Sequence, residues 1–286
     1  MLITRLHLQA LSLVVIALGG CAHAAKPAEP TTPATAAPAL VATAEIGTQE
    51  LSYEAGDMQL KGFLAFPASA TDKRPGILVG HEWWGLNEHA RTVARKLAEL
   101  GYVALAIDMY GDGKSTEHPA DAKTWMMQIM QNPDEGTKRF EAGRAALAAD
   151  AHVDPTRLAA IGYCMGGALV LQAARRGDDF KAIGVFHGNY ATQAPLQKDK
   201  FHGKIFIAHG AADSFSPPEA VAALKKELDD AGANYELVSY QGAKHGFTNP
   251  AATELGQKNG LDVAYDEQAD HESWAKLQEV LTQAFH

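Results

Sequence analysis

A single cysteine stands at the centre of the glycine-rich segment Gly162-Tyr163-Cys164-Met165-Gly166-Gly167. The apolar residues 158–161 before it predict a buried strand, and residues 168–174 after it predict a helix. This strand-turn-helix order is typical of a nucleophile elbow, a sharp turn that exposes a nucleophilic side chain. Glycines two positions before and after Cys164 allow strand and helix to approach closely around a strained turn. The pattern predicts a nucleophilic thiol, whose thiolate the N-terminus of the following helix favours.

The same hexapeptide also fits an ordinary glycine-rich loop between strand and helix, in which Cys164 would be a small buried hydrophobic residue. A nucleophile additionally needs a base and an acid that orients the base, and in folds with this elbow they follow it in chain order. Asp213 follows the apolar residues 205–208, and His245 comes after a predicted strand that ends at Tyr240. The order predicts a Cys164, Asp213 and His245 triad.

Each partner has a plainer interpretation when it is taken alone. His245 is one of 12 histidines and could lie in a surface loop. Asp213 precedes Ser-Phe-Ser-Pro-Pro and could serve as a turn or helix-cap residue. The two residues in order after the elbow are a stronger indication than either one.

Trp83 lies in the loop that follows the apolar residues 77–79, next to Glu82. In folds with this elbow, that loop donates one backbone N–H to an oxyanion hole, and the residue after the nucleophile donates the other. We therefore expect the backbone amides of Trp83 and Met165 to stabilise a developing oxyanion. The loop could otherwise be a packed, partly solvated turn.

Strands and helices alternate from about residue 48 to the end of the chain, which predicts an α/β fold: a mostly parallel central sheet with helices on both faces. The functional groups of such a sheet lie at the carboxyl ends of its strands. Strands are predicted at 51–55, 58–66, 76–80, 102–107, 158–161, 182–186, 205–208 and 235–240, and helices at 88–100, 120–130, 134–149, 168–174, 218–231 and 262–285.

Several motifs together resemble the dienelactone hydrolase family over residues 50–286: the cysteine elbow, the segment Glu82-Trp83-Trp84-Gly85-Leu86-Asn87, the segment Asp108-Met109-Tyr110, and the later Asp213 and His245-Gly246-Phe247. The resemblance implies an α/β-hydrolase fold, a Cys-His-Asp triad and no metal or other cofactor. It also implies that Glu82 pairs with the resting thiol and helps to generate the thiolate when substrate binds.

The substrate of the family's dienelactone-cleaving members is less well supported by the sequence. Those members hold a substrate carboxylate with arginines just after the D-x-Y segment and shortly after the triad histidine. Here neither Gly111-Asp112-Gly113 nor Thr248-Asn249-Pro250 contains an arginine, and Asp112 would disfavour a dianionic lactone. Candidate pocket walls are Trp84, Tyr110, Trp125, His187 and Phe247, in addition to Trp83.

The leading hypothesis is a hydrolase that cleaves a small-molecule carboxylic ester or lactone through a thioester acyl-enzyme at Cys164. Two alternatives use the same sequence features. An acyltransferase would pass the acyl group from Cys164 to an alcohol or amine acceptor. A non-enzymatic exported binding protein would retain the fold without using the triad.

The N-terminal residues predict export. Arg5 precedes the apolar residues 8–18, which are too few to span a membrane. Leu18-Gly19-Gly20-Cys21 resembles a bacterial lipobox, and we expect residues 1–21 to be a signal peptide with lipidation of Cys21. Cleavage after Ala22-His23-Ala24 would instead release a soluble protein. We predict a linker rich in alanine and proline at 22–47, a folded domain at 48–286, and a periplasmic or envelope-anchored bacterial protein.

The composition argues against some classes of binding partner. The formal net charge is −9, and no block of lysine and arginine is present, which argues against a nucleic-acid binder. Membrane contact is expected only through the N-terminal lipid, and the sequence is compatible with a monomer or a small homo-oligomer. Of the two cysteines, Cys164 has no partner for an intramolecular disulfide once Cys21 is lipidated or removed. A free thiol in an oxidising compartment is expected to be buried or used.

Overall fold

The structure is a computed structural model that describes residues 45–286. The predicted signal peptide at 1–21, the predicted lipidation site Cys21 and the linker up to residue 44 lie outside the described residues. No helix in residues 45–286 combines the length and the apolar character needed to cross a membrane.

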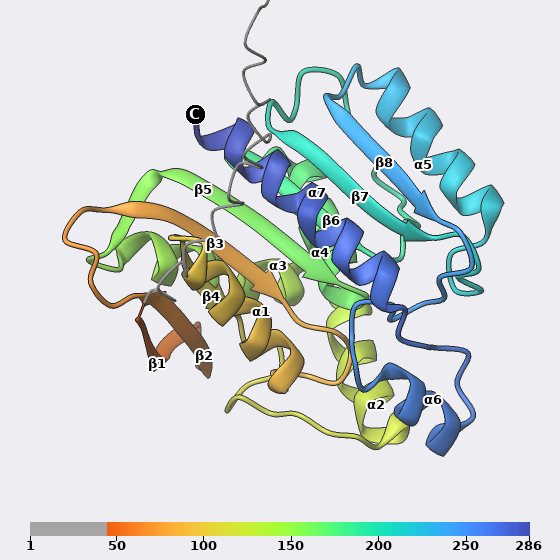
Figure 1. The fold of residues 1–286 in the computed structure, drawn as a ribbon, viewed down its shortest axis with the longest axis horizontal. Helices are drawn as coiled ribbons and strands as arrows, with labels where there is room; N and C mark the ends of the chain where they lie inside the picture. Colours follow the sequence, from red (N-terminus) through yellow and green to blue (C-terminus); the bar gives the residue numbers. More distant parts are fainter. Residues whose placement is uncertain (1–44) are drawn as a thin grey trace, which may run out of the picture. The chain divides into compact units, whose positions relative to one another are not determined.

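One eight-stranded sheet runs through the described residues in the order β1-β2-β4-β3-β5-β6-β7-β8 (Figure 1). β1 and β2 form an antiparallel hairpin, and β2 pairs antiparallel with β4. All other neighbours pair in parallel. The strands are β1 (Ile46–Ala55), β2 (Met58–Pro67), β3 (Arg74–Gly80), β4 (Val103–Ala106), β5 (Val153–Tyr163), β6 (Ala182–Phe186), β7 (Lys204–Gly210) and β8 (Tyr235–Tyr240). The predicted α/β fold with a mostly parallel sheet is confirmed.

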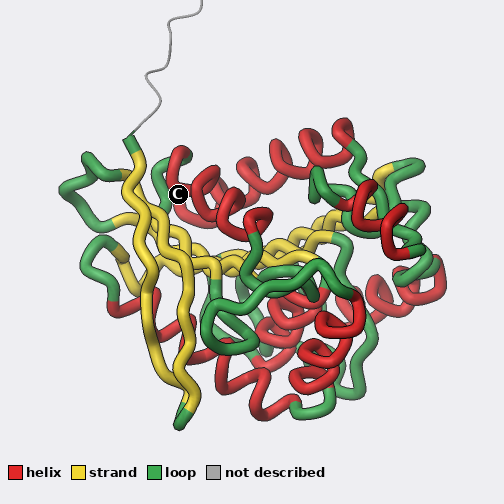
Figure 2. The backbone as a smooth tube through the Cα atoms, turned by 90° about the horizontal axis from the view of Figure 1, so that it is seen from below, coloured by secondary structure: helices red, strands yellow, loops and turns green. Residues whose placement is uncertain are grey.

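Helices cover both faces of this sheet (Figure 2). α1 and α7 pack on one face, and α3, α4 and α5 pack on the other. α2 and α6 pack together with the loop after β3 through Ala122, Leu255 and Trp84. The helices are α1 (Glu88–Glu99), α2 (Pro119–Met130), α3 (Pro133–Ala149), α4 (Met165–Arg176), α5 (Pro218–Asp230), α6 (Ala252–Asn259) and α7 (Glu267–Phe285).

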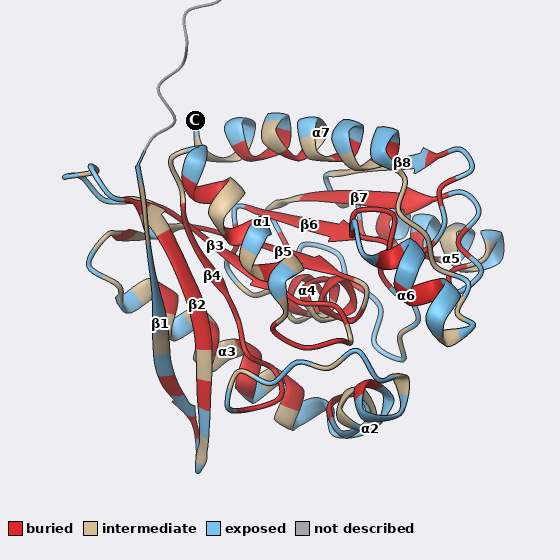
Figure 3. Ribbon diagram, turned by 60° about the horizontal axis from the view of Figure 1, so that its bottom comes forward, coloured by how far each residue is buried: buried red, intermediate tan, exposed pale blue. Residues whose placement is uncertain are grey.

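The central strands are buried on both faces, as Figure 3 shows along β3, β4 and β6. Their side chains are almost continuously apolar, which is the pattern of parallel strands covered by helices on both sides. The chemistry-bearing residues follow the carboxyl ends of these strands. Cys164 follows β5, His187 follows β6, Asp213 follows β7 and His245 follows β8.

The structure corrects several predicted boundaries, among them the start of β5, which is Val153 instead of residue 158. β1 begins at Ile46 instead of residue 51, because its whole length pairs with β2. The helix predicted over 262–285 begins only at Glu267, where the Asp266 side chain accepts a hydrogen bond from the backbone N–H of Ala269 (3.0 Å). A separate helix, α6, was not predicted. The residues between these two helices are not helical, and Val263 forms a β-bridge with His245.

Candidate active site

Cys164 is the residue between β5 and α4, and its backbone has φ +54° and ψ −113°. This left-handed φ is strained for a residue with a side chain, at a cost of about 1–3 kcal/mol. The strained turn is held from both sides: the backbone N–H of Cys164 donates to the carbonyl of Phe186 (3.0 Å), and its carbonyl accepts from the N–H of Ala168 (3.2 Å). The thiol is free and half-buried. Position, strain and exposure agree with the predicted elbow.

The glycines of the elbow are required by backbone contacts. A Cβ atom on Gly162 would lie 2.2 Å from the carbonyl oxygen of Gly166. A Cβ atom on Gly166 would lie 2.3 Å from the carbonyl oxygen of Gly80, at the end of β3. The N–H of Gly166 also donates to the carbonyl of His81 (3.1 Å). The elbow is thus packed directly against the loop that carries Glu82 and Trp83.

His245 and Asp213 meet as the sequence predicted. Their Nδ1 and Oδ2 atoms lie 2.9 Å apart, and both side chains are nearly buried. Burial lowers the pKa of His245, but the negative charge of the Cys164 sulfur and the hydrogen bond with Asp213 outweigh it and raise the pKa to about 10. An ionised Cys164 thus favours the protonated imidazole, and His245 lies close enough to Cys164 to interact with it.

The loop that carries His245 is fixed by the extended segment before α7. The N–H of Ala264 donates to the carbonyl of His245 (3.1 Å), and the N–H of Asp266 donates to the carbonyl of Phe247 (3.0 Å). Residues that were predicted to begin a helix thus hold the triad histidine in place.

The two predicted oxyanion-hole amides lie on the elbow and on the loop beside it. Met165 is the first residue of α4, so its N–H has no acceptor within the helix. Within residues 45–286, neither this N–H nor that of Trp83 donates a hydrogen bond. Both amides are available for a substrate oxygen, which suits the predicted role.

Glu82 is buried and has two polar partners in the described chain. The Asn249 side-chain amide donates to Glu82 Oε2 (2.5 Å), and Nδ1 of His89 lies 3.7 Å from the same oxygen. The predicted pairing of Glu82 with the resting thiol is not among its contacts. Asn249 was not identified by sequence reasoning as a site residue. Its position four residues after His245 was the available signal, since the loop that carries the triad histidine also reaches Glu82.

His187 is fully buried and has φ +39° at the end of β6. Its Nε2 lies 2.9 Å from the Thr248 hydroxyl, and its ring is T-shaped against His245 with centroids 5.0 Å apart. Burial, together with the charges of His245 and His89, lowers the pKa of His187 well below the ordinary value, so this imidazole is neutral.

Three of the predicted pocket walls are instead part of the packing around the site. His187 and Phe247 have no exposed surface, and their rings lie 5.3 Å apart behind His245. Trp84 is buried in the cluster between α2 and α6. His187 and Phe247 therefore support the loops of the site from within, whereas Trp84 also lines a cavity of about 640 Å³, beside His89 and Asn249.

Tyr110 lies against the elbow, and Trp125 lies next to Tyr110. The Tyr110 hydroxyl donates to the carbonyl of Trp83 (2.9 Å) or to the Met165 sulfur (3.2 Å). Burial and the charge of Cys164 raise the pKa of Tyr110. The ring of Trp125, on α2, lies 5.5 Å from that of Tyr110. These two aromatic residues remain candidates for the pocket wall.

Asp108, the first residue of the D-x-Y segment, fixes the loop of Tyr110. It accepts hydrogen bonds from the backbone N–H groups of Lys61, Tyr110, Gly111 and Gly113 (2.8 to 3.0 Å).

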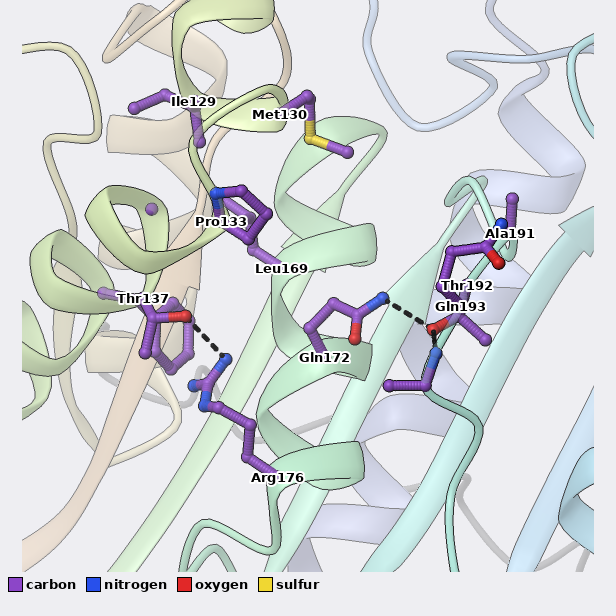
Figure 4. Close-up of a pocket in the computed structure, with 13 residues that line it drawn as sticks. Ile129, Met130, Pro133, Thr137, Leu169, Gln172, Arg176, Ala191, Thr192 and Gln193 are labelled. Carbon is purple, nitrogen blue, oxygen red and sulfur yellow. Dashed lines mark hydrogen bonds between the residues drawn. The ribbon is translucent and has the colours of Figure 1, made fainter.

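A cavity of about 500 Å³ lies along α4, away from the triad. Its apolar lining includes Ile129, Phe140 and Leu169, and a hydrogen bond from Gln172 to Thr192 (3.4 Å) crosses one side (Figure 4). Cys164 does not line it. Residues 45–286 contain no group of three or more His, Cys, Asp or Glu side chains arranged to hold a metal ion.

Known proteins and a family model match most of the chain. The model of the dienelactone hydrolase family matches residues 60–285. A protein of Salmonella typhimurium strain LT2 that bears the name "Putative carboxymethylenebutenolidase" is 27% identical over 253 residues, which cover 84% of this chain and 92% of that protein.

Two solved structures are similar throughout the folded part. The structure called m3DLH is 32% identical with a TM-score of 0.79, and a dienelactone hydrolase-like promiscuous phosphotriesterase from metagenomic libraries is 29% identical with a TM-score of 0.77. Each alignment covers 84% of this chain and 99% of the other.

Proposed function

The chain belongs to the dienelactone hydrolase family and is a dienelactone hydrolase-like hydrolase of the α/β-hydrolase fold, and from this premise we propose that it cleaves carboxylic esters or lactones with Cys164 as the nucleophile. The observation that carries the proposal is the strained cysteine turn beside a protonated His245 that Asp213 holds at 2.9 Å. A thiolate and an imidazolium so placed are ready for nucleophilic attack and for protonation of a leaving group.

In the acylation step, the Cys164 thiolate attacks the ester carbonyl carbon and forms a C–S bond. The carbonyl oxygen becomes an oxyanion, which the free amides of Trp83 and Met165 stabilise. When the tetrahedral intermediate collapses, the C–O bond breaks and His245 donates its proton to the leaving alcohol. The product of this step is a thioester on Cys164 and a neutral His245.

In the deacylation step, neutral His245 accepts a proton from water, and the resulting hydroxide attacks the thioester carbonyl. The C–S bond breaks, the carboxylic acid leaves and the thiolate is regenerated beside a protonated His245. Asp213 keeps the imidazole oriented in both steps because its carboxylate holds Nδ1.

We propose neutral or weakly charged esters and lactones as substrates, in preference to a dianionic lactone. Asp112, after the D-x-Y segment, is exposed, and the only basic group near its carboxylate in the described chain is Lys61 at 3.9 Å. The position after Phe247 carries Thr248 and Asn249, and the Asn249 amide is already bound to Glu82. Neither 111–113 nor 248–250 supplies an arginine or lysine for a substrate carboxylate.

For Glu82, we propose that the partners Asn249 and His89 keep its carboxylate away from the resting thiol. His245, not Glu82, then supplies the charge that stabilises the thiolate.

We further propose that the enzyme is exported and anchored to the bacterial envelope through lipidated Cys21. This proposal is supported by the lipobox-like sequence at 18–21.

The test is a panel of esters and lactones, with and without a substrate carboxylate, hydrolysed by the wild type and by the Cys164→Ala and Cys164→Ser variants. Since one similar protein acts on phosphotriesters, the panel also includes a phosphotriester. We expect Cys164→Ala to abolish turnover and neutral esters to be hydrolysed faster than charged ones. Turnover retained by Cys164→Ala contradicts the assignment of the nucleophile.

A further inference from the structure

Phe215 is a large hydrophobic residue with about half of its surface exposed (51%). It lies two residues after Asp213 in the loop between β7 and α5. Its ring contacts the imidazole of His245, with centroids 4.9 Å apart and planes inclined by 55°. An exposed aromatic ring in contact with the proton donor of the reaction offers an apolar surface to whatever approaches that donor.

The position of Phe215 is fixed by the triad itself. One oxygen of Asp213 holds His245, and the other accepts hydrogen bonds from the backbone N–H groups of Phe215 (2.8 Å) and Ser216 (3.3 Å). The buried Ser216 hydroxyl donates to the carbonyl of Gly188 (2.8 Å), which ties the loop to the end of β6. Two prolines follow and restrict the backbone before α5 begins. The loop backbone is therefore in place before substrate binds, which reduces the entropic cost of contact.

The reaction requires the leaving alcohol to lie beside His245. His245 protonates the leaving oxygen, so that oxygen must lie within hydrogen-bond reach of the imidazole. His187, the aromatic neighbour behind the imidazole, has no exposed surface, whereas Phe215 is open. Tyr110 contacts Met165 on the elbow and lies near the Cys164 sulfur, where the acyl group is bound. The alcohol part of the ester can extend from His245 only toward accessible surface, and Phe215 provides it.

We propose that Phe215 is a specificity-determining residue that packs against the alcohol part of the ester, so that esters of aromatic and other apolar alcohols are preferred. This inference rests on the proposed hydrolysis at Cys164. The preference concerns the acylation step alone, because the alcohol has left before water attacks the thioester. The acyl part of the substrate does not contribute to it.

The test compares benzyl acetate with methyl acetate, which share the acetyl group and have alcohols of similar acidity. We expect Phe215→Ala to lower kcat/KM for the benzyl ester by about tenfold, since the lost apolar contact is of the size of a partly buried aromatic ring. The loss should be smaller for the methyl ester, so that the ratio of the two kcat/KM values falls, and Phe215→Leu should recover part of that ratio. Circular dichroism checks that the variant is folded, and the ratio cancels any effect on His245 that both esters share.

Met130→Ala is the matched control, because Met130 is similarly exposed (45%) but lines the cavity along α4 (Figure 4). It should leave the ratio of the two esters unchanged. The inference is overturned if Phe215→Ala leaves that ratio unchanged, or if Met130→Ala alters it as strongly. Cys164→Ala separates the two proposals when the Phe215→Ala prediction fails: if Cys164→Ala abolishes turnover of both esters, only the alcohol site is wrong, and if it retains turnover, the proposed function is wrong as well.

Discussion

At the scale of single residues, the proton on His245 decides how the site works. Burial disfavours that proton, while the charge of Cys164 and the hydrogen bond with Asp213 stabilise it and place the pKa near 10. An imidazole that is protonated at rest acts first as an acid and only then as a base. In the proposed mechanism, the nucleophile and the proton donor are thereby both in their reactive forms when substrate binds.

We expect kcat/KM for a neutral ester to stay high on the alkaline side and to fall as the pH rises through about 10, where His245 loses its proton. Asp213→Asn should move this fall to lower pH, because it removes one of the groups that raise the pKa. The measurement is a pH–rate profile corrected for spontaneous hydrolysis. A fall near the ordinary histidine pKa in the wild type contradicts the charged pair.

Glu82 and Asp213 are expected to differ in their influence on the thiol. At neutral pH, Asp213→Asn should slow alkylation of Cys164 by iodoacetamide by about tenfold, which corresponds to ~1.4 kcal/mol of lost stabilisation of the charged pair. Glu82→Gln should have a much smaller effect, because its carboxylate is held by Asn249 and His89. Equal slowing by both substitutions would show that Glu82 helps to generate the thiolate, as the family resemblance implies.

The triad could be predicted from sequence because each member follows a recognisable strand in a fixed order. The roles of Asn249 and Phe215 could not. Asn249 binds a residue 167 positions away, and Phe215 depends on a contact between two loops. Such contacts arise from tertiary packing and leave no periodic or spacing signal. The two buried residues behind His245 were assigned to a pocket wall for the same reason, since a loop aromatic gives no indication of its burial.

At the scale of elements, the elbow is where strand, turn and helix depend on each other most closely. β5 delivers Cys164, α4 begins directly after it, and β3 touches both through Gly80 and Gly166. Two backbones in contact leave no room for a side chain. Stability and catalysis therefore depend on the same glycines.

Gly166→Ala should destabilise the fold and abolish activity, because the new Cβ would lie 2.3 Å from the carbonyl oxygen of Gly80 and 2.8 Å from that of His81. Overpacking against rigid neighbours costs about 1–3 kcal/mol of unfolding free energy, and backbone atoms cannot move aside easily. Gly232→Ala is the control: its Cβ meets nothing within 4 Å, and its cost is that of the left-handed φ alone, about 1 kcal/mol. Urea denaturation measures both. Equal losses would show that the elbow is not tightly packed.

Most strands and helices were predictable, since apolar runs and capping residues mark them locally. The exceptions lie where contacts with another element determine the structure. Pairing with β2 lengthens β1. Residues 262–264 are not helical, because Val263 and Ala264 bind the loop of His245. In residues 262–264, a tertiary contact overrides the helical pattern of the sequence.

At the scale of the whole molecule, parallel pairing from β4 to β8 brings the carboxyl ends of six strands to the same side of the sheet. This topology gathers residues that lie up to 167 positions apart in the chain, from Glu82 to Asn249. The alternation of strands and helices was enough to predict that arrangement. The family resemblance added the identity of the fold.

The location of the molecule depends on the N-terminal segment. We expect the wild-type protein to sediment with the membrane fraction and to require detergent for release, because lipidated Cys21 inserts acyl chains into the bilayer. Cys21→Ala should appear in the soluble periplasmic extract and keep its esterase activity. Wild-type protein found without lipid in the soluble extract would favour cleavage after Ala24.

Mass spectrometry of enzyme quenched during turnover of an activated acetate ester shows whether Cys164 carries the acyl group. We expect one added acetyl group on the tryptic peptide that begins at Leu158 and ends at Arg175, and none in Cys164→Ala. His245→Asn should slow both acylation and deacylation, because the thiolate then lacks its charged partner and water lacks its base. An acetyl group on another residue, or continued turnover by Cys164→Ala, would contradict the account.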